Sequence, residues 1–212
     1  GSPTGNTTVT YPLADARPTR SCVIDRVTNV YTYAVTGLES WTLAGAEGAA
    51  LDLDLNLVGL DESIGNSGTF PSLNLDTTTF PFKFTDCIIN CNSTAYLTRE
   101  FRLSCDYHID KTRFFNTQTL TGIYSLDRTV TLEFSMPDCD AQVLYGVGRG
   151  GFSVVITATT GNSVLTFTMP AVAFPRETPP VPERREIMLP LRGQAFRSGT
   201  TLELSASLNA TP

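Results

Sequence analysis

Apolar and polar residues alternate strictly along several short stretches of this 212-residue chain. The most regular stretch is residues 51–57, where four leucines alternate with Asp52, Asp54 and Asn56. Successive side chains of a β-strand point to opposite faces of a sheet. The pattern therefore predicts a half-buried strand, with its leucines packed on the core and its polar side chains on the opposite face.

The same period of two recurs along the chain and predicts further strands, because each run is bounded by residues that favour turns. Gly161-Asn162 is expected to form a tight hairpin turn between two of them. About ten strands of this kind indicate an all-β fold, an antiparallel β-sandwich or barrel. The expected strands cover residues 27–35, 51–57, 80–89, 101–107, 130–134, 152–159, 165–169, 187–196 and 202–207.

Three other features are expected around this sheet. One short helix is predicted at residues 141–145, because Asp138 can cap its start and glycines follow its end. Two long connections, residues 59–72 and 174–186, are rich in Gly, Ser, Asn or Pro and are predicted to be extended arms. Residues 1–19 are expected to be an extended leading segment, and the whole chain, 1–212, to form one domain.

Charge and hydropathy exclude two classes of function. The net charge is −6, and the 15 basic residues are scattered except for Arg184 and Arg185, so tight binding to a nucleic-acid backbone is not expected. The longest apolar runs fall far short of the roughly 18 residues of a membrane-spanning helix, and no signal-peptide pattern opens the chain. A soluble protein with no membrane partner is predicted.

Five cysteines cannot all pair within one chain, so a reducing compartment is predicted. Cys87 and Cys91 have a spacing that allows a zinc site as an alternative. That alternative is disfavoured because the run 84–89 has the pattern of a strand and the one histidine, His108, lies well away in the sequence. No metal and no cofactor are expected.

Motifs for catalysis are weak. Gly146, Gly148 and Gly151 match a dinucleotide-binding fingerprint by spacing, but here the expected helix precedes the glycines and a strand follows, which reverses the required order. There is no serine nucleophile elbow, and imidazole chemistry would depend on His108 alone. Paired carboxylates could act in a glycosidase, but Asp52 and Asp54 lie on the polar face of a regular strand, where a solvated role is ordinary. A non-enzymatic protein is predicted.

An alternative function is a secreted or cell-surface β-sandwich that binds a partner. Three Asn-x-Ser/Thr sequons, at Asn6, Asn92 and Asn209, would suit a glycoprotein. A chain so rich in Ser and Thr contains such tripeptides by chance, so the sequons favour this alternative only weakly.

The order of segments from residue 20 to 208 resembles the tail tube proteins of long-tailed bacteriophages, also called major tail proteins of siphophages. Tyr33-Ala34-Val35-Thr36-Gly37-Leu38 and the strand after it are similar to the opening of that family. The segment Ile187-Met188-Leu189-Pro190-Leu191-Arg192-Gly193-Gln194-Ala195 looks like its closing strand. The intervening likeness lies in residues 84–90, 97–106, 128–134, 152–157 and 165–172, with the short helix between 128–134 and 152–157.

The resemblance implies a structural virion protein that assembles into hexameric rings, whose sheets join into one barrel around a channel. Stacked rings would form the tube through which DNA leaves the capsid without specific binding. The implied partners are further copies of the chain and other tail proteins, such as the tape measure and terminator proteins. The implied location is the phage tail, assembled in the host cytoplasm.

Two groups of residues are expected to have roles in such a tube. Asp52, Asp54 and Asn56 are predicted to line the channel, because their strand is the most regular in the chain and acidic groups would repel DNA weakly. The proline-rich arm 174–186 is predicted to reach a neighbouring subunit. Its charged residues, expected to contact acidic or basic groups there, are Arg176, Glu177, Glu183, Arg184 and Arg185.

Overall fold

The computed structural model describes residues 7–12, 19–26, 29–66, 81–111, 122–125, 127–137, 151–175 and 188–210. These residues form fifteen β-strands and one 3₁₀ turn, with no α-helix among them. The predicted all-β, antiparallel fold is confirmed, although with more strands than expected. The predicted helix at 141–145 and its cap Asp138 lie outside the described residues, as does the cysteine at 139.

The strands that the sequence did not predict lie before residue 27 and between residues 59 and 130. Their bounds are β1 (Thr7–Pro12), β2 (Arg20–Asp25), β3 (Asn29–Ala46), β4 (Asp52–Gly59), β5 (Glu62–Asn66), β6 (Cys87–Cys91), β7 (Thr94–Tyr96), β8 (Glu100–Asp106), β9 (Ile109–Asp110), β10 (Tyr124–Ser125), β11 (Thr129–Pro137), β12 (Phe152–Thr160), β13 (Ser163–Ala173), β14 (Met188–Ala195) and β15 (Ser205–Ala210).

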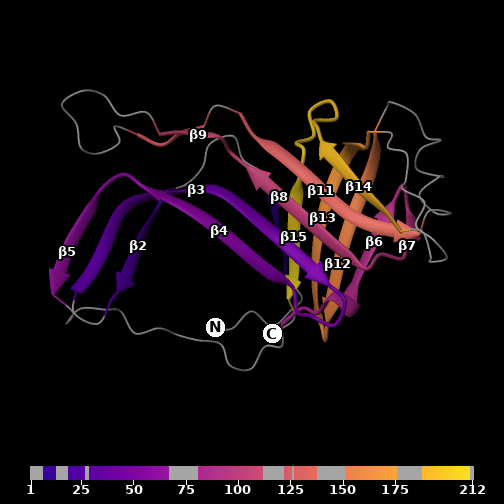
Figure 1. The fold of residues 1–212 in the computed structure, drawn as a ribbon, viewed down its shortest axis with the longest axis horizontal. Helices are drawn as coiled ribbons and strands as arrows, with labels where there is room; N and C mark the ends of the chain where they lie inside the picture. Colours follow the sequence, from indigo (N-terminus) through magenta and orange to yellow (C-terminus); the bar gives the residue numbers. More distant parts are fainter. Residues whose placement is uncertain are drawn as a thin grey trace.

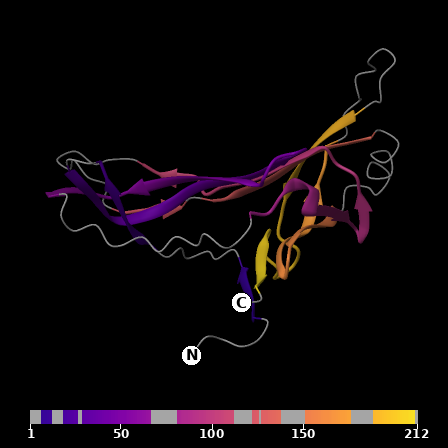
Figure 2. The ribbon, with the colours of Figure 1, turned by 90° about the horizontal axis from the view of Figure 1, so that it is seen from below.

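Thirteen of these strands belong to one antiparallel sheet that folds over into two layers (Figures 1 and 2). The first layer runs in the order β4–β3–β8–β11–β14, and the second in the order β1–β15–β13–β12–β6–β7. Strand β13 joins the layers, because it pairs with β15 along residues 164–168 and with β14 at Val172 and Ala173. In Figure 1 the strands of the second layer cross those of the first steeply.

The core fills the space between the two layers. Its centre is aliphatic, and Leu103, Val130, Leu132, Val154 and Met169 are completely buried there. Because alternate residues of β8, β11 and β12 face the same side, every second residue of these strands is buried and those between are more exposed.

The first half of β3 projects beyond the core. Strand β3 has 18 residues. Its second half pairs with β4 and β8, whereas its first half pairs with β2 on one side and β5 on the other. These three strands, β2, β3 and β5, form a blade that extends past the edge of the second layer (Figures 1 and 2).

The hairpin turns follow simple backbone rules. The predicted turn at Gly161-Asn162 is confirmed: Thr160 pairs with Ser163, and Gly161 has a φ of +55°. A second two-residue turn, Asn92-Ser93, joins β6 to β7, with positive φ at both positions as a type I′ turn requires.

Two sequence predictions of local structure were wrong. Residues 84–89 were expected to be strand throughout, but Phe84–Asp86 forms a 3₁₀ turn and only Cys87–Cys91 is strand. Asp86 accepts a hydrogen bond from the backbone N–H of Lys83, which stabilises the turn over the extended form. The connection 59–72 is also shorter than predicted, since β5 occupies Glu62–Asn66; residues 67–72 lie outside the described part.

Substitution at Gly45 should test how tightly the layers pack. A Cβ atom there would lie 2.6 Å from Phe101, 2.8 Å from Leu51 and 3.1 Å from Phe84. We expect Gly45→Ala to lower the free energy of unfolding by about 1–3 kcal/mol, measured by urea denaturation. Gly65→Ala is the matched control, because the nearest atom to a Cβ there is 4.0 Å away. Equal stability of the two variants would contradict this prediction.

Candidate assembly surface

The polar side chains of β4 lie on the outer face of the first layer, which we call the polar face. Asp52, Asp54 and Asn56 are all exposed there. The β3 residues paired with them are Ala44, Thr42 and Ser40, and the amide of Asn56 donates a hydrogen bond to the Ser40 hydroxyl at 2.8 Å. Strand alternation therefore places these three predicted site residues together on one side, opposite the leucines of the same strand.

A row of charged residues crosses this face from one strand to the next. Asp52 pairs with Ala44, Ala44 with Arg102, Arg102 with Glu133, and Glu133 with Arg192. Glu133 and Arg192 form an ion pair of 3.1 Å. We call this set the charged row; apart from Ala44 it alternates in sign, with a carboxylate at the β4 end and a guanidinium at the β14 end.

A groove of about 590 Å³ lies along the charged row. All five residues of the row line the groove, together with several small residues, among them Ala46 and Ala50. Sequence reasoning missed both the row and the groove, because the residues come from five strands whose register is set by long-range pairing.

The leucines of β4 do not pack as predicted. Leu53, Leu55 and Leu57 are 54%, 53% and 51% exposed, although the pattern indicated a leucine face buried on the core. They pair with Leu43, Trp41 and Leu38 of β3 and so point to the core side of the layer. They stay exposed because β4 is the end strand of the first layer, and the second layer does not extend far enough to cover it. We call these three residues the leucine stripe.

Strand β4 also leaves one backbone edge open. Among the described strands it pairs with β3 alone, from Ala44–Asp52 to Thr36–Gly59. Just before β4, the Leu51 N–H donates to the Phe82 carbonyl at 2.8 Å, so the open edge begins at Asp52. An unpaired edge beside an exposed apolar stripe is a template for pairing with another chain.

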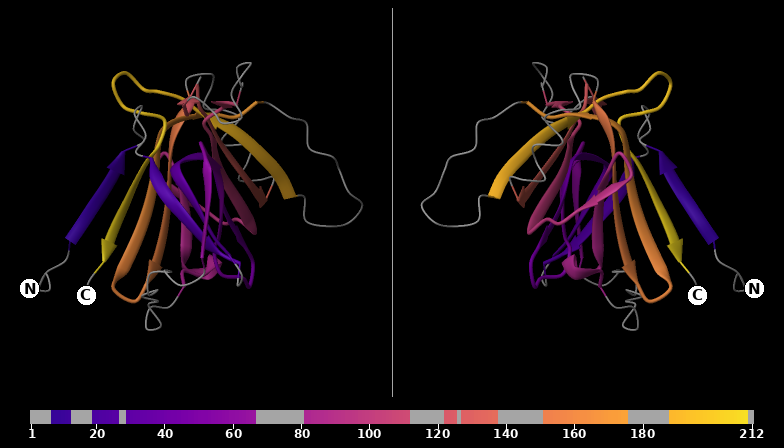
Figure 3. Two further views of the ribbon diagram at one scale, coloured as in Figure 1. Left: turned by 90° about the vertical axis from the view of Figure 1, so that its left-hand side faces the viewer. Right: turned by 90° about the vertical axis from the view of Figure 1, so that its right-hand side faces the viewer.

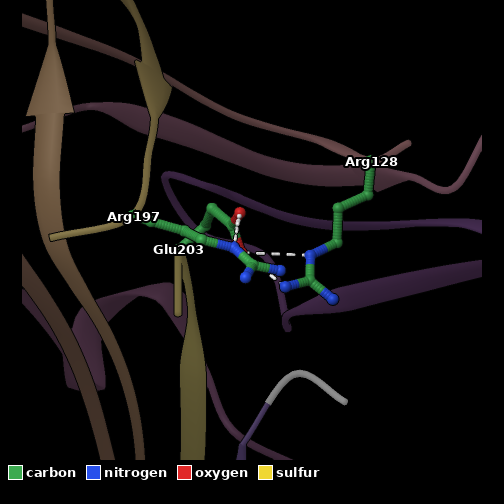
Figure 4. A network of polar contacts seen from close by, with 3 residues as sticks. All are labelled: Arg128, Arg197 and Glu203. Atoms are coloured by element: carbon green, nitrogen blue, oxygen red, sulfur yellow. Dashed lines mark hydrogen bonds and ion pairs between the residues drawn. The ribbon is translucent and has the colours of Figure 1, made fainter. Parts of the chain in front are cut away.

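An ion-pair network fixes the start of β15 against the start of β11 (Figure 4). Glu203 accepts hydrogen bonds from Arg128 at 2.6 Å and from Arg197 at 3.0 Å. The side chains of Arg128 and Glu203 are only 8% and 14% exposed. Burial raises the pKa of Glu203, but hydrogen bonds from its own backbone and from the two arginines outweigh burial and hold the pKa below its ordinary value.

The network should make stability depend on pH. Because the pKa of Glu203 is lower in the folded chain, its contribution is present above pH ~4.3 and is lost as the pH falls through the folded pKa. We expect Glu203→Gln to lower the free energy of unfolding at pH 7 by about 1–3 kcal/mol, and the loss to shrink in acid. Glu133→Gln, whose partner Arg192 is exposed, should change it by less than ~0.5 kcal/mol. Urea denaturation at pH 7 and in acid measures these free energies of unfolding. An equal effect of Glu203→Gln under the two conditions would contradict the predicted pH dependence.

Cys87 and Cys91, the alternative zinc site, and His108, the one imidazole, occupy ordinary structural positions. Burial raises the pKa of the Cys91 thiol to about 12, and burial together with Asp86 raises that of Cys87 to about 11. The two residues are four apart on a strand, about 13 Å of chain, which is too far for one zinc ion. His108 follows β8 with a φ of +44°, and its Nδ1 lies 2.9 Å from Asp127.

Several predicted residues receive no further placement. The charged residues of the proline-rich arm, Arg176, Glu177, Glu183, Arg184 and Arg185, lie outside the described residues, as does the sequon at Asn6. Of the other sequons, Asn92 lies in an exposed turn. Asn209 lies within β15 between β13 and β1, and its amide oxygen is buried, which makes it a poor acceptor for a glycan.

Comparison with known proteins gives no family assignment for this chain. No protein-family model matches it, and no curated protein matches it. Within the described ranges, no helix is long and apolar enough to cross a membrane. In the same residues, no group of three or more His, Cys, Asp and Glu side chains is arranged to hold a metal ion.

Proposed function

We propose that this chain is a non-enzymatic structural subunit that assembles into hexameric rings, which stack to form the tail tube of a bacteriophage. The observation that carries the proposal is the leucine stripe beside the open edge of β4. An exposed stripe on an unpaired edge favours a chain whose stable form is an assembly.

Burial of the stripe would contribute useful energy to assembly. Covering the exposed half of a leucine side chain is worth roughly 1 kcal/mol, so Leu53, Leu55 and Leu57 together would contribute about 3 kcal/mol for each contact. A closed ring repeats that contact around its circumference. Hydrogen bonds along the β4 edge would add direction, so that neighbouring copies meet in one register.

The polar face suits the wall of a channel for DNA. Asp52 and Asp54 of six subunits would place a dozen carboxylates around the lumen, where their potentials overlap within the ~8 Å screening length of physiological salt. The same face also carries Arg102, Glu133 and Arg192, so these three carboxylates and two guanidinium groups leave each subunit with a net negative charge there. A net negative wall repels phosphates, so DNA would pass without adhering. In this proposal the subunits assemble in the host cytoplasm, contact the tape measure and terminator proteins in the tail, and need no cofactor.

The proposal is tested by the size and shape of the purified full chain. Light scattering should report a hexamer or larger at tens of micromolar protein and physiological salt, and negative-stain images should show rings or tubes. A strictly monomeric chain under these conditions would contradict the proposed function.

The lining of the channel can be tested by reversing charge on the polar face. We expect Asp54→Lys to fold normally and to form tubes that retain DNA at low salt, with retention weakening as salt rises. A filter-binding assay at several salt concentrations measures this. The matched control is Glu47→Lys, which makes the same change in net charge at an exposed turn position off the strand. Equal DNA retention by both variants would assign the lumen to another surface.

A further inference from the structure

The first layer has a second open edge besides that of β4. Strand β14 pairs with β11 along its whole length, but with β13 only at Ala195 and Gln194. Among the described strands, nothing pairs with the other side of β14 from Met188 to Gly193. Pro190 lies within this stretch, and a proline in a sheet is typical of an edge strand.

The two open edges carry opposite charge on the same face. The charged row ends with Asp52 at the β4 edge and with Arg192 at the β14 edge. Arg192 is 73% exposed, so its guanidinium can reach beyond its own chain while it also contacts Glu133. If the β14 edge of one copy met the β4 edge of the next, Arg192 would face Asp52 and the alternation of sign would continue across the junction.

The directions of the strands decide what kind of junction this is. Each neighbouring pair from β4 to β14 is antiparallel, and four such steps leave β4 and β14 pointing the same way. A junction between two different edges that point the same way is head to tail. Repetition of a head-to-tail contact closes a ring when the rotations add up to a full turn, and otherwise gives an open filament.

The open edges at the two ends of the second layer fit β4 less well. Strand β1 lies on the opposite flank from β14 in Figure 3, and its residues, Thr7–Pro12, include no charged side chain to match Asp52. Strand β7 is three residues long. Of these three edges, that of β14 offers both length and a complementary cation on the polar face.

From the open edges, the charged row and the strand directions, we infer that β14 of one copy pairs in parallel with β4 of the next copy, with Arg192 beside Asp52 at each junction. This inference rests on the proposed function, because it names the contact through which the ring closes. It also accounts for the leucine stripe, which would continue the apolar side of the neighbour's β14, where Leu189 and Leu191 are already buried.

Charge reversal with mixing tests this junction. Arg192→Asp alone puts two carboxylates at every junction, and Asp52→Arg alone puts two guanidinium groups there. We expect each variant alone to need at least about tenfold more protein than the parent for half-assembly. In a one-to-one mixture an alternating ring pairs opposite charges at every junction, so assembly should return to near the parent's concentration. Light scattering and negative-stain images measure both effects.

The outcomes separate this inference from the proposed function. Glu133→Gln removes the partner of Arg192 within the chain without changing the junction, and should assemble like the parent. If the parent forms rings and both reversed variants do so equally well, the junction is elsewhere while the proposed function stands. If both variants fail and the mixture fails too, although each melts like the parent, head-to-tail pairing of these residues is wrong. A parent that never assembles removes the proposed function itself.

Discussion

Leu55→Lys is expected to abolish assembly while leaving the chain folded. Leu55 is the middle residue of the leucine stripe and is 53% exposed, so a lysine there costs little in the isolated chain. At a junction the same side chain would be covered by a neighbour, and burying an unpaired ammonium group is costly. We expect no rings at tens of micromolar protein, and a melting temperature within about 2 °C of the parent.

The matched control for this variant is Leu97→Lys. Leu97 is 80% exposed and lies between β7 and β8, away from the open edge of β4. It makes the same chemical change on the same scaffold, and should assemble like the parent in light scattering and negative stain. Rings formed by Leu55→Lys at the parent's concentration would show that the leucine stripe is not an interface, and the proposed function would lose its principal support.

Local patterns predicted most of the fold because strand formation leaves a local signature. Alternation identified β8, β11 and β13, and the Gly161-Asn162 turn was predicted because a two-residue hairpin needs a residue that tolerates positive φ. The 3₁₀ turn at Phe84–Asp86 was missed because its apolar residues have the pattern of a strand. The turn is stabilised instead by a hydrogen bond from the Lys83 backbone N–H to the Asp86 carboxylate.

The exposure of the leucine stripe could not be predicted from alternation. A period of two assigns Leu53, Leu55 and Leu57 to one face of β4, and that assignment agrees with the structure. Whether a second layer covers that face depends on the order of strands in the sheet. Leu43, in the neighbouring strand β3, has the same pattern but is 5% exposed, because the second layer reaches it. The leucine stripe is therefore exposed because the second layer covers β3 at Leu43 but does not cover β4.

The full set of residues on the polar face was even harder to predict, because it depends on long-range strand pairing. Asp52, Asp54 and Asn56 were grouped correctly from one strand, but the charged row joins them to Arg102, Glu133 and Arg192 of three other strands. Arg102 and Glu133 are 31 positions apart along the chain, and Glu133 and Arg192 are 59 positions apart. These residues become neighbours only through the register of the sheet. A bulge between Leu38 and Ser40 also shifts the register of β3 and β4, and nothing in the sequence pattern marks it.

Phe134→Ala is expected to cause the largest loss of stability of the substitutions considered. Phe134 of β11 is 3% exposed, and its ring packs edge-on against Phe174 with 5.6 Å between centroids. Phe174 in turn stacks on Phe152 of β12 at 5.2 Å, so this cluster ties the first layer to the second. Truncation removes the ring and leaves a cavity that neighbouring strands cannot close, which typically costs 3–5 kcal/mol, and we expect about that loss in urea denaturation.

The conservative variant Phe134→Leu distinguishes a cavity from a general intolerance of change. It keeps an apolar side chain but loses the edge-on contact with Phe174, so we expect it to cost less than half as much as Phe134→Ala. Because Phe134 is adjacent in sequence to Glu133 of the charged row, loosening β11 should also disturb the polar face. Ring formation by Phe134→Ala should therefore fall together with its folded fraction as temperature rises. If Phe134→Ala and Phe134→Leu unfolded at the same urea concentration, the aromatic cluster would not be what holds the two layers together at this end of the core.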